Sequence, residues 1–231
     1  MYKYLGVELG NCLTFKAFKE RILAHARVNM GRIWRMGIKS GYLSVKGSVN
    51  LWQALMRSVL EYGSEIWGRD KWLPGEQVQA DMARRILRCS SITSRDAMYG
   101  DLGWWSLQGR RNLKKLIYWY KLETLENSRL LKKVYLVTAA NKKTTSAAMI
   151  MKGLLVQYEL GHLWDNKQSM FNLDGQGNLA ATCLSDHMAF WKKFIKSRIH
   201  QFEEKTWWDR VTKDYEQKKT RTYITFKNNC A

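Results

Sequence analysis

The chain has 231 residues, 45% of them hydrophobic, and a formal net charge of +19 at pH 7. This hydrophobic content, with one proline and sixteen glycines, excludes an intrinsically disordered chain and predicts a packed core in one large or two small domains. So large a positive charge favours a polyanionic partner, with nucleic acid first and an anionic membrane surface second. The longest apolar runs are too short to span a bilayer and no secretory signal stands at the N-terminus, so we expect an intracellular protein, nuclear or cytoplasmic, without membrane partners.

The sequence carries no convincing metal or cofactor signature, and we expect no cofactor. Four cysteines occur without a Cys-x-x-Cys pair and are expected to be reduced thiols: Cys12, Cys89, Cys183 and Cys230. Cys183, His187 and His200 lie near one another in sequence, but a fourth metal ligand has no evident source. Residues 175–180 fit a Gly-x-Gly-x-x-Ala pattern, yet no acidic residue follows at the distance of a ribose contact, so a tight turn explains the pattern better.

The first elements in chain order are a strand and a basic helix. Residues 2–9 alternate and predict a short strand, which would belong either to a larger fold or to a weak hairpin. Residues 14–36 predict a long helix with Thr14 as its N-cap and an apolar stripe formed by Phe15, Phe18, Ile22, Ala26, Met30 and Ile33. Its other face sets six basic residues against Glu20 alone: Lys16, Lys19, Arg21, Arg27, Arg32 and Arg35. Both a solvated face and a phosphate-binding face fit this imbalance.

A connector and a second helix follow. Residues 37–47 contain three glycines together with Lys39 and Lys46, and predict a connector. Residues 51–68 predict one helix whose buried side carries Trp52, Leu55, Met56, Val59, Tyr62 and Ile66. Gly63 lies in the same stripe, which indicates a close approach of backbones. Glu61 and Glu65 are expected on the opposite side, each four residues from an arginine.

Two further helices carry basic clusters. Residues 74–88 predict a helix begun by Pro74, with Glu76 near its positive end and Val78, Met82 and Ile86 buried. Its C-terminal cluster suits either the helix dipole or a phosphate: Arg84, Arg85 and Arg88. A short helix over 93–99 and a turn containing Trp104 and Trp105 lead to a helix over 107–124 capped by Ser106. Positive charges near its start oppose the dipole and favour a functional interpretation: Arg110, Arg111, Lys114 and Lys115.

The rest of the chain is also expected to be helical, over residues 128–135, 145–164 and 185–204. Residues 141–145 are polar and predict a linker, and residues 174–178 predict a turn, the site of a small hairpin. The fold class is therefore mainly α, a multi-helix protein with a short N-terminal strand. Clustered carboxylates for two-metal catalysis are missing, and the adjacent pair Glu203–Glu204 fits a solvated helix face better.

The order of several segments resembles the region after the catalytic palm in reverse transcriptases of non-LTR (LINE-like) retrotransposons. The resemblance begins with Tyr4-Leu5-Gly6 and the basic helix, and continues through residues 62–68, which read Tyr-Gly-Ser-Glu-Ile-Trp-Gly. It includes the residues Gln77, Gln79, Arg84, Arg85, Ile86 and Leu87, and then the run from Gly103 to Leu107 that leads into Arg110-Arg111. Trp207-Trp208, Arg221-Thr222-Tyr223 and Phe226-Lys227 resemble the end of such proteins.

The resemblance implies a division of the chain into four parts. Residues 1–10 would be a residual palm-edge strand, in which Tyr4, Leu5 and Gly6 lie near the primer. Residues 11–70 would be a thumb-like segment, 71–140 a basic helical region and 141–231 a C-terminal helical region with a tail. The positions with a structural role would be Trp52, Tyr62, Gly63, Glu65, Trp67, Trp104 and Trp105. The family's paired catalytic aspartates and its cysteine–histidine knuckle have no match in this sequence, which is therefore expected to be a truncated piece of the element.

The sequence thus predicts a fragment that grips template–primer or structured RNA through basic helices and has no catalytic centre of its own. Its expected partners are RNA, RNA–DNA hybrid or DNA, and the missing palm domain of the same element. Two alternatives remain open at this point. The chain could be a subunit of an active RNA-directed DNA polymerase completed by an upstream chain, or a helical interaction module without a nucleic-acid role.

Overall fold

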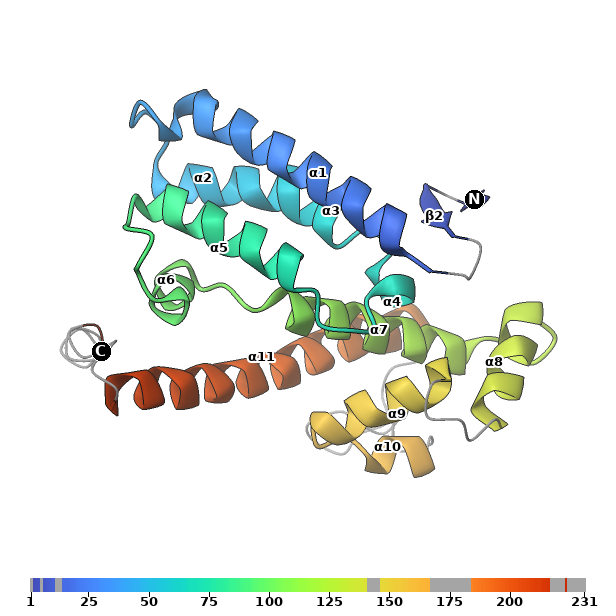
Figure 1. Ribbon diagram of the computed structural model, residues 1–231. Coiled ribbons are helices and arrows are strands. Elements are labelled where there is room, and N and C mark those ends of the chain that lie inside the picture. Colours follow the sequence, from blue (N-terminus) through green and yellow to red (C-terminus); the bar gives the residue numbers. More distant parts are fainter. Residues whose placement is uncertain are drawn as a thin grey trace. The chain divides into compact units, whose positions relative to one another are not determined.

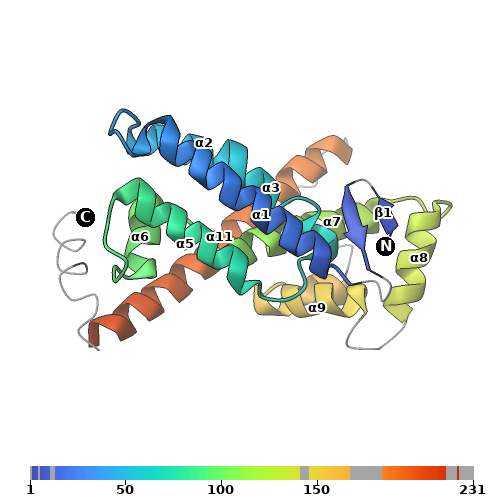
Figure 2. The same ribbon diagram turned by 45° about the horizontal axis from the view of Figure 1, so that its top comes forward.

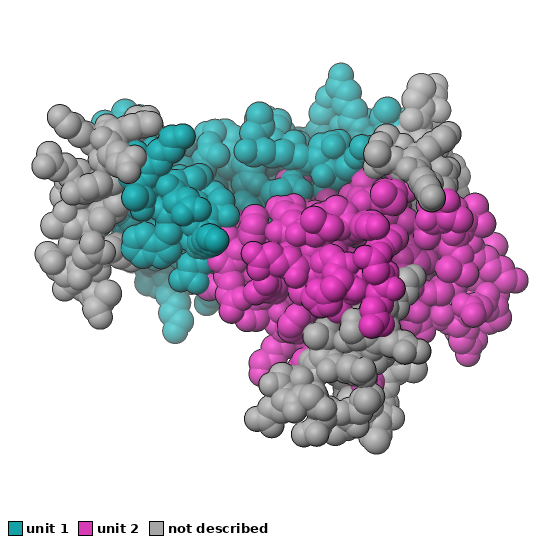
Figure 3. Space-filling model, turned by 90° about the horizontal axis from the view of Figure 1, so that it is seen from below, with its two compact units in different colours: residues 1–110, 204–231 teal, residues 111–203 magenta. Residues whose placement is uncertain are grey.

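A computed structural model describes residues 2–4, 6–10, 14–140, 146–166, 184–216 and 223, and the chain in it is mainly helical, as predicted (Figure 1). The chain forms two compact units, one of residues 1–110 and 204–231 and the other of residues 111–203 (Figure 3). The helices α7 (Leu107–Thr124) and α11 (Leu184–Glu216) each contribute residues to both units. These divisions differ from the four segments expected from the sequence. Among the described helices, none is both long and apolar enough to cross a membrane.

The N-terminal residues of the first unit form a hairpin, which is the second of the two alternatives, rather than one continuous strand over residues 2–9. Strands β1 (Tyr2–Tyr4) and β2 (Val7–Leu9) pair antiparallel, with Tyr4 opposite Val7. Gly6 has a φ of +80° in the turn between them, a conformation that glycine adopts without a steric penalty. Alternation along a sequence does not reveal a chain reversal, because the same period of two continues through both strands.

The basic helix is confirmed. Helix α1 (Lys16–Ile33) buries Phe18, Ile22, Ala26 and Ile33, and it continues into a short π-helix, η1 (Trp34–Ile38). The N-cap position is Phe15 rather than Thr14, and no side chain caps the helix there. The turn after η1 closes through the N–H of Leu43, which donates to the carbonyl of Gly37 at 3.2 Å. Helix α2 (Val45–Leu51) follows and is capped by Ser44, whose Oγ accepts a hydrogen bond from the N–H of Gly47 at 3.1 Å.

The single helix predicted over residues 51–68 is divided. Helix α2 continues through η2 (Trp52–Arg57) and α3 (Ser58–Leu60), and α4 (Ser64–Trp67) follows a break at Gly63, where φ is +61°. The phase of the buried face shifts along this stretch, beginning in the π-helical turn η2. Trp52 and Met56 are buried as expected, but Tyr62 and Ile66 are 50% and 61% exposed. Beyond Met56, the buried positions are Leu60, Glu61, Ser64, Trp67 and Gly68.

Helix α5 (Leu73–Leu87) begins with proline in its first turn, as predicted, and its Glu76 is buried. The carboxylate of Glu76 accepts hydrogen bonds from the N–H groups of Leu107 at 3.3 Å and Gln108 at 3.0 Å, and so satisfies two free donors at the start of α7. Ser106 caps the same helix end, as predicted, by accepting from the N–H of Gly109 at 2.9 Å. The observed bounds of α7 are those predicted from the apolar spacing.

Helix α6 (Arg95–Leu102) is longer than the helix predicted over residues 93–99, and the end of α11 packs against it within the first unit. The indole N–H of Trp207 donates to the carbonyl of Asp96 at 2.7 Å, and a Cβ on Gly100 would lie 2.5 Å from the Trp207 ring. Trp207 and Trp208 lie within α11 and not in the expected tail. Elsewhere in this core, the rings of Trp52 and Trp104 stack with centroids 4.9 Å apart.

The second unit contains most of α7, the first part of α11 and three shorter helices, α8 (Leu130–Ala140), α9 (Ala147–Gln157) and α10 (His162–Asp165). The helix predicted over 145–164 is divided before α10, where Glu159 has a φ of +61°. Helix α8 lies later than the predicted range 128–135, and α11 extends beyond the predicted range 185–204. The turn predicted at 174–178 falls outside the described residues. The rings of Tyr120 and Trp191 stack in the core, 5.0 Å apart.

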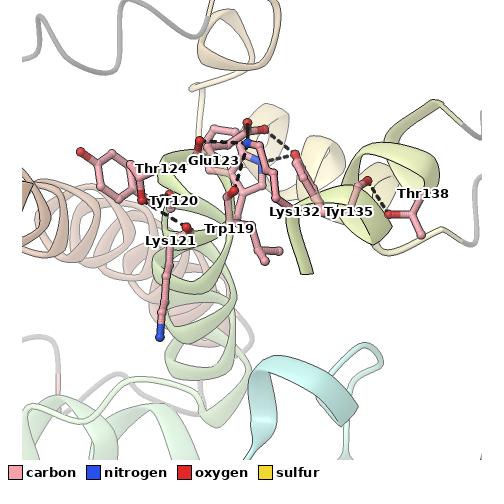
Figure 4. A network of polar contacts seen from close by, with 9 residues as sticks. Trp119, Tyr120, Lys121, Glu123, Thr124, Lys132, Tyr135 and Thr138 are labelled. Atoms are coloured by element: carbon pink, nitrogen blue, oxygen red, sulfur yellow. Dashed lines mark hydrogen bonds and ion pairs between the residues drawn. The ribbon is translucent and has the colours of Figure 1, made fainter. Parts of the chain in front are cut away.

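A buried polar cluster ties α8 to the end of α7 (Figure 4). The ammonium group of Lys132 donates to the carbonyl oxygens of Leu122 at 3.0 Å and Glu123 at 2.9 Å, and to the Glu123 carboxylate at 3.2 Å. The hydroxyl of Tyr135 donates to the same carboxylate and accepts from the indole N–H of Trp119 at 3.0 Å. Helix α8 therefore turns polar groups inward, while Leu130, Val134 and Val137 are 76%, 52% and 71% exposed.

Candidate nucleic-acid interface

The stretch between Glu20 and Glu61 contains seven basic residues and no acidic residue. The structure places this stretch on α1, η1, α2, η2 and α3, all in the first unit. Figures 1 and 2 show the C-terminal end of α1, the start of α2 and the C-terminal end of α5 at the same end of this unit. Basic residues that the sequence places on separate elements are therefore brought to one region.

We call this region the basic end and define it by six side chains: Arg32, Arg35, Lys39, Lys46, Arg85 and Arg88. Two contacts join its elements. The guanidinium of Arg88 donates to the carbonyl of Ile38 at 2.5 Å, and that of Arg85 lies over the ring of Trp34, 5.4 Å from its centroid. Arg88 itself ends α5 in a left-handed conformation, with a φ of +52°. The end of α5 is thereby fixed against η1.

Most of the side chains of the basic end are open to solvent. Five of the six are exposed, and Arg85 is half-buried. None of the six forms an ion pair with a carboxylate of a described residue. The only polar contacts of Arg32 and Arg35 within the described residues are long ones, at 3.4 Å to the side chain of Asn29 and the carbonyl of Gly31. Like charges gathered without counter-charges favour binding of a polyanion.

The other cations predicted on α1 and α5 have diverse environments. Lys16 and Arg27 are exposed. The ammonium of Lys19 lies over the ring of Trp67, 5.7 Å from its centroid, and Arg21 donates to the carbonyl of Gly6 while its guanidinium lies over Phe18. Arg84 pairs with Asp81 at 3.1 Å. Arg21 and Arg84 therefore have structural roles within the first unit.

The basic residues near the start of α7 do not form an exposed surface, which corrects the sequence interpretation. Arg110, Arg111 and Lys115 are 8%, 0% and 2% exposed, and Lys114 is half-buried. The guanidinium of Arg110 donates to the side chain of Gln79 at 3.3 Å and lies 3.9 Å from the Glu61 carboxylate. Its burial lowers the pKa of Arg110 to about 10. The charge of Arg110, which opposes the helix dipole, is offset by a buried carboxylate rather than by an external phosphate.

The predicted palm-edge residues lie at the hairpin. Tyr4 belongs to β1 and Gly6 to the turn, while Leu5 lies outside the described residues. Of the predicted structural positions, Trp52, Trp67 and Trp104 are buried, Glu65 and Trp105 are half-buried and Tyr62 is exposed. Within the described residues, no group of three or more His, Cys, Asp or Glu side chains is placed to hold a metal ion.

One exposed aromatic residue beside the basic end was not predicted from the sequence as a site residue. Tyr42 lies in the turn between η1 and α2 and is 91% exposed. The available signal was an aromatic residue in a glycine-containing connector between two lysines, Lys39 and Lys46.

Comparisons of this chain with protein-family models, with curated proteins and with solved structures give no match.

Proposed function

We propose that this chain binds nucleic acid through phosphate contacts made by the basic end. The observation that carries the proposal is the set of six cations drawn from α1, η1, α2 and α5, none of which pairs with a carboxylate of a described residue. Phosphate contacts need no base recognition, so the binding is expected to depend weakly on sequence and strongly on salt.

We further propose that the chain is a thumb-like piece of a non-LTR reverse transcriptase without a catalytic centre. The ligand would then be a template–primer hybrid or structured RNA. The order along the chain of the segments that resemble this family supports the proposal. The alternative is a subunit of an active RNA-directed DNA polymerase that an upstream chain completes, and an upstream reading frame with paired aspartates would favour it.

Salt titration of binding tests the phosphate contacts. The affinity for an RNA–DNA hybrid, a duplex RNA and a single strand is measured by fluorescence anisotropy between about 50 and 200 mM salt, where each neutralised phosphate contributes roughly −0.9 to the logarithmic slope for a duplex. The double variant Arg32→Gln/Arg35→Gln should weaken binding to all three ligands and make the slope less steep by roughly two.

A matched control separates position from overall charge. Lys192→Gln/Lys193→Gln removes the same number of charges from two exposed residues of α11 in the second unit, and should leave the slope nearly unchanged. Equal effects of the two double variants would show diffuse attraction and overturn the assignment to the basic end. No binding at low salt would favour the interaction module instead. Primer extension by the isolated chain would overturn the absence of a catalytic centre.

A further inference from the structure

Tyr42 is presented to solvent on a turn that is held in place. Its side chain is 91% exposed, although tyrosine carries a large apolar ring. The turn closes through the hydrogen bond from the N–H of Leu43 to Gly37, and the hydroxyl of Ser40 donates to the same carbonyl at 3.4 Å. Gly41 has a φ of +86°, and Ser44 caps the helix that follows. The backbone on both sides of Tyr42 is therefore fixed.

Contacts from α5 add a second restraint on this turn. Arg88 donates to the carbonyl of Ile38, and a Cβ on Gly41 would lie 3.2 Å from a terminal nitrogen of its guanidinium. The turn thus rests on the end of α5, and glycine suits position 41 because of its positive φ. An aromatic ring on a restrained turn loses little conformational freedom when it binds, because tyrosine has only two side-chain torsions.

The surroundings of Tyr42 favour nucleic acid over an apolar partner. Lys39 and Lys46 flank it in sequence and are exposed, and Arg32, Arg35 and Arg88 belong to the same basic end. An aromatic ring beside cations is the combination that holds single-stranded nucleic acid, since a base stacks on the ring while the cations contact the backbone phosphates. Bases inside a duplex already stack on one another, so their faces are closed to an external ring.

We infer that Tyr42 is a stacking platform for an unpaired base, and that the basic end takes nucleic acid with unpaired nucleotides in preference to blunt duplex. This inference rests on the proposed function, because the same cations supply the phosphate contacts. It goes further by naming the ring that contacts a base and the state of that base.

The test compares Tyr42→Ala with Tyr42→Phe in the full chain. The ligands are a labelled single strand of about twelve nucleotides, within the usual site sizes for single-strand binding, and a blunt duplex of the same length. Tyr42→Ala should weaken single-strand binding by roughly five- to hundredfold and leave duplex binding nearly unchanged. Tyr42→Phe should bind like the wild type, because it keeps the ring. Ile92→Ala is the matched control, since Ile92 is also 91% exposed but has no aromatic face.

A second measurement ties the effect to a base. Abasic nucleotides are placed at each position of the strand in turn. At least one placement should weaken wild-type binding and leave Tyr42→Ala unaffected, so that the two changes are not additive. Equal losses on single strand and duplex, or full additivity at every position, would overturn the stacking role. If the wild type binds with a steep salt slope but Tyr42→Ala has no effect, only this inference fails. If the wild type binds neither ligand at low salt, the proposed function fails with it.

Discussion

The carboxylate of Glu61 lies 3.9 Å from the guanidinium of Arg110, and both side chains are buried. Glu61 also accepts from Arg57 at 2.9 Å, and Arg57 is 38% exposed in its side chain. Arg110 reaches Gln79 on α5 as well. One buried carboxylate therefore links the break before α4 to the start of α7, through residues that the sequence suggested would face solvent or nucleic acid.

Removing Glu61 alone should destabilise the protein severely. Glu61→Leu leaves the Arg110 charge buried without its carboxylate, and we expect a loss of about 3–5 kcal/mol in the free energy of unfolding. Replacing both residues, by Glu61→Leu and Arg110→Met, should cost less than the sum of the two single changes. Urea unfolding followed by circular dichroism measures all three variants.

The exposed pair Arg69–Asp70 provides the control for this experiment. Its charged atoms are 3.7 Å apart and its side chains are 49% and 77% exposed. Asp70→Ala should change stability by less than about 0.5 kcal/mol. A Glu61→Leu variant as stable as Asp70→Ala would show that the buried ion pair contributes little.

Gly63 should tolerate few side chains, and the reason differs from the one that the sequence suggested. Its φ of +61° lies in the left-handed region, which strains any residue with a Cβ. An added Cβ would also lie 3.4 Å from a methyl group of Val7. Gly63→Ala should cost about 1–2 kcal/mol through backbone strain, Gly63→Asn should cost less, and Gly63→Leu should cost more because Val7 and Trp67 crowd the site. Thermal unfolding of the three variants gives the order.

Gly31 is the natural comparison because it lies in α1, and a Cβ added there would have no neighbouring atom within 4 Å. Gly31→Ala should stabilise the protein by about 0.5–1 kcal/mol, since alanine favours the helix over the unfolded chain. Equal effects at positions 31 and 63 would contradict the assignment of strain to Gly63.

In helix α8, we expect mutation of the charged Lys132 to cost more stability than mutation of an apolar residue. Lys132→Met removes the group that satisfies the last carbonyls of α7 and leaves the Glu123 carboxylate without its cation, so we expect a loss of about 2–4 kcal/mol. Val137→Ala on the same helix should cost less than about 0.5 kcal/mol, because Val137 is 71% exposed. Urea unfolding of the two variants measures both losses. A larger loss for Val137→Ala than for Lys132→Met would contradict the described orientation of α8.

Alkaline pH should weaken the second unit through Tyr158. Burial raises the pKa of Tyr158 from 10.0 to about 12, and its hydroxyl accepts a hydrogen bond from Asn112 at 2.9 Å. Since the folded state retains the proton longer than the unfolded chain, the resulting stabilisation is fully present below pH 10.0 and is lost as the pH rises towards about 12.

Tyr158→Phe removes this part of the pH dependence. At neutral pH it should cost about 1 kcal/mol, because the Asn112 amide loses its acceptor. Between pH 10.0 and about 12, its unfolding free energy should fall less steeply than that of the wild type. Urea unfolding at several pH values measures the slopes, and parallel slopes would refute a role for Tyr158.

Helical periodicity and local capping chemistry determine much of this fold without reference to other elements. The bounds of α7, the Ser106 cap and the proline in the first turn of α5 follow from short-range contacts, which a sequence encodes directly. The acid-free stretch between Glu20 and Glu61 likewise follows from the sequence alone.

Tertiary structure decides which charges face solvent and where helices break. Arg32 and Arg110 look alike in sequence, yet one is exposed and the other is enclosed by Glu61 and Gln79 from distant elements. The buried face shifts along η2 and α3, ahead of the left-handed Gly63, so that Glu61 turns inward and Tyr62 outward. A period of 3.6 residues predicts a face but not what packs against it, because burial depends on partners tens of residues away.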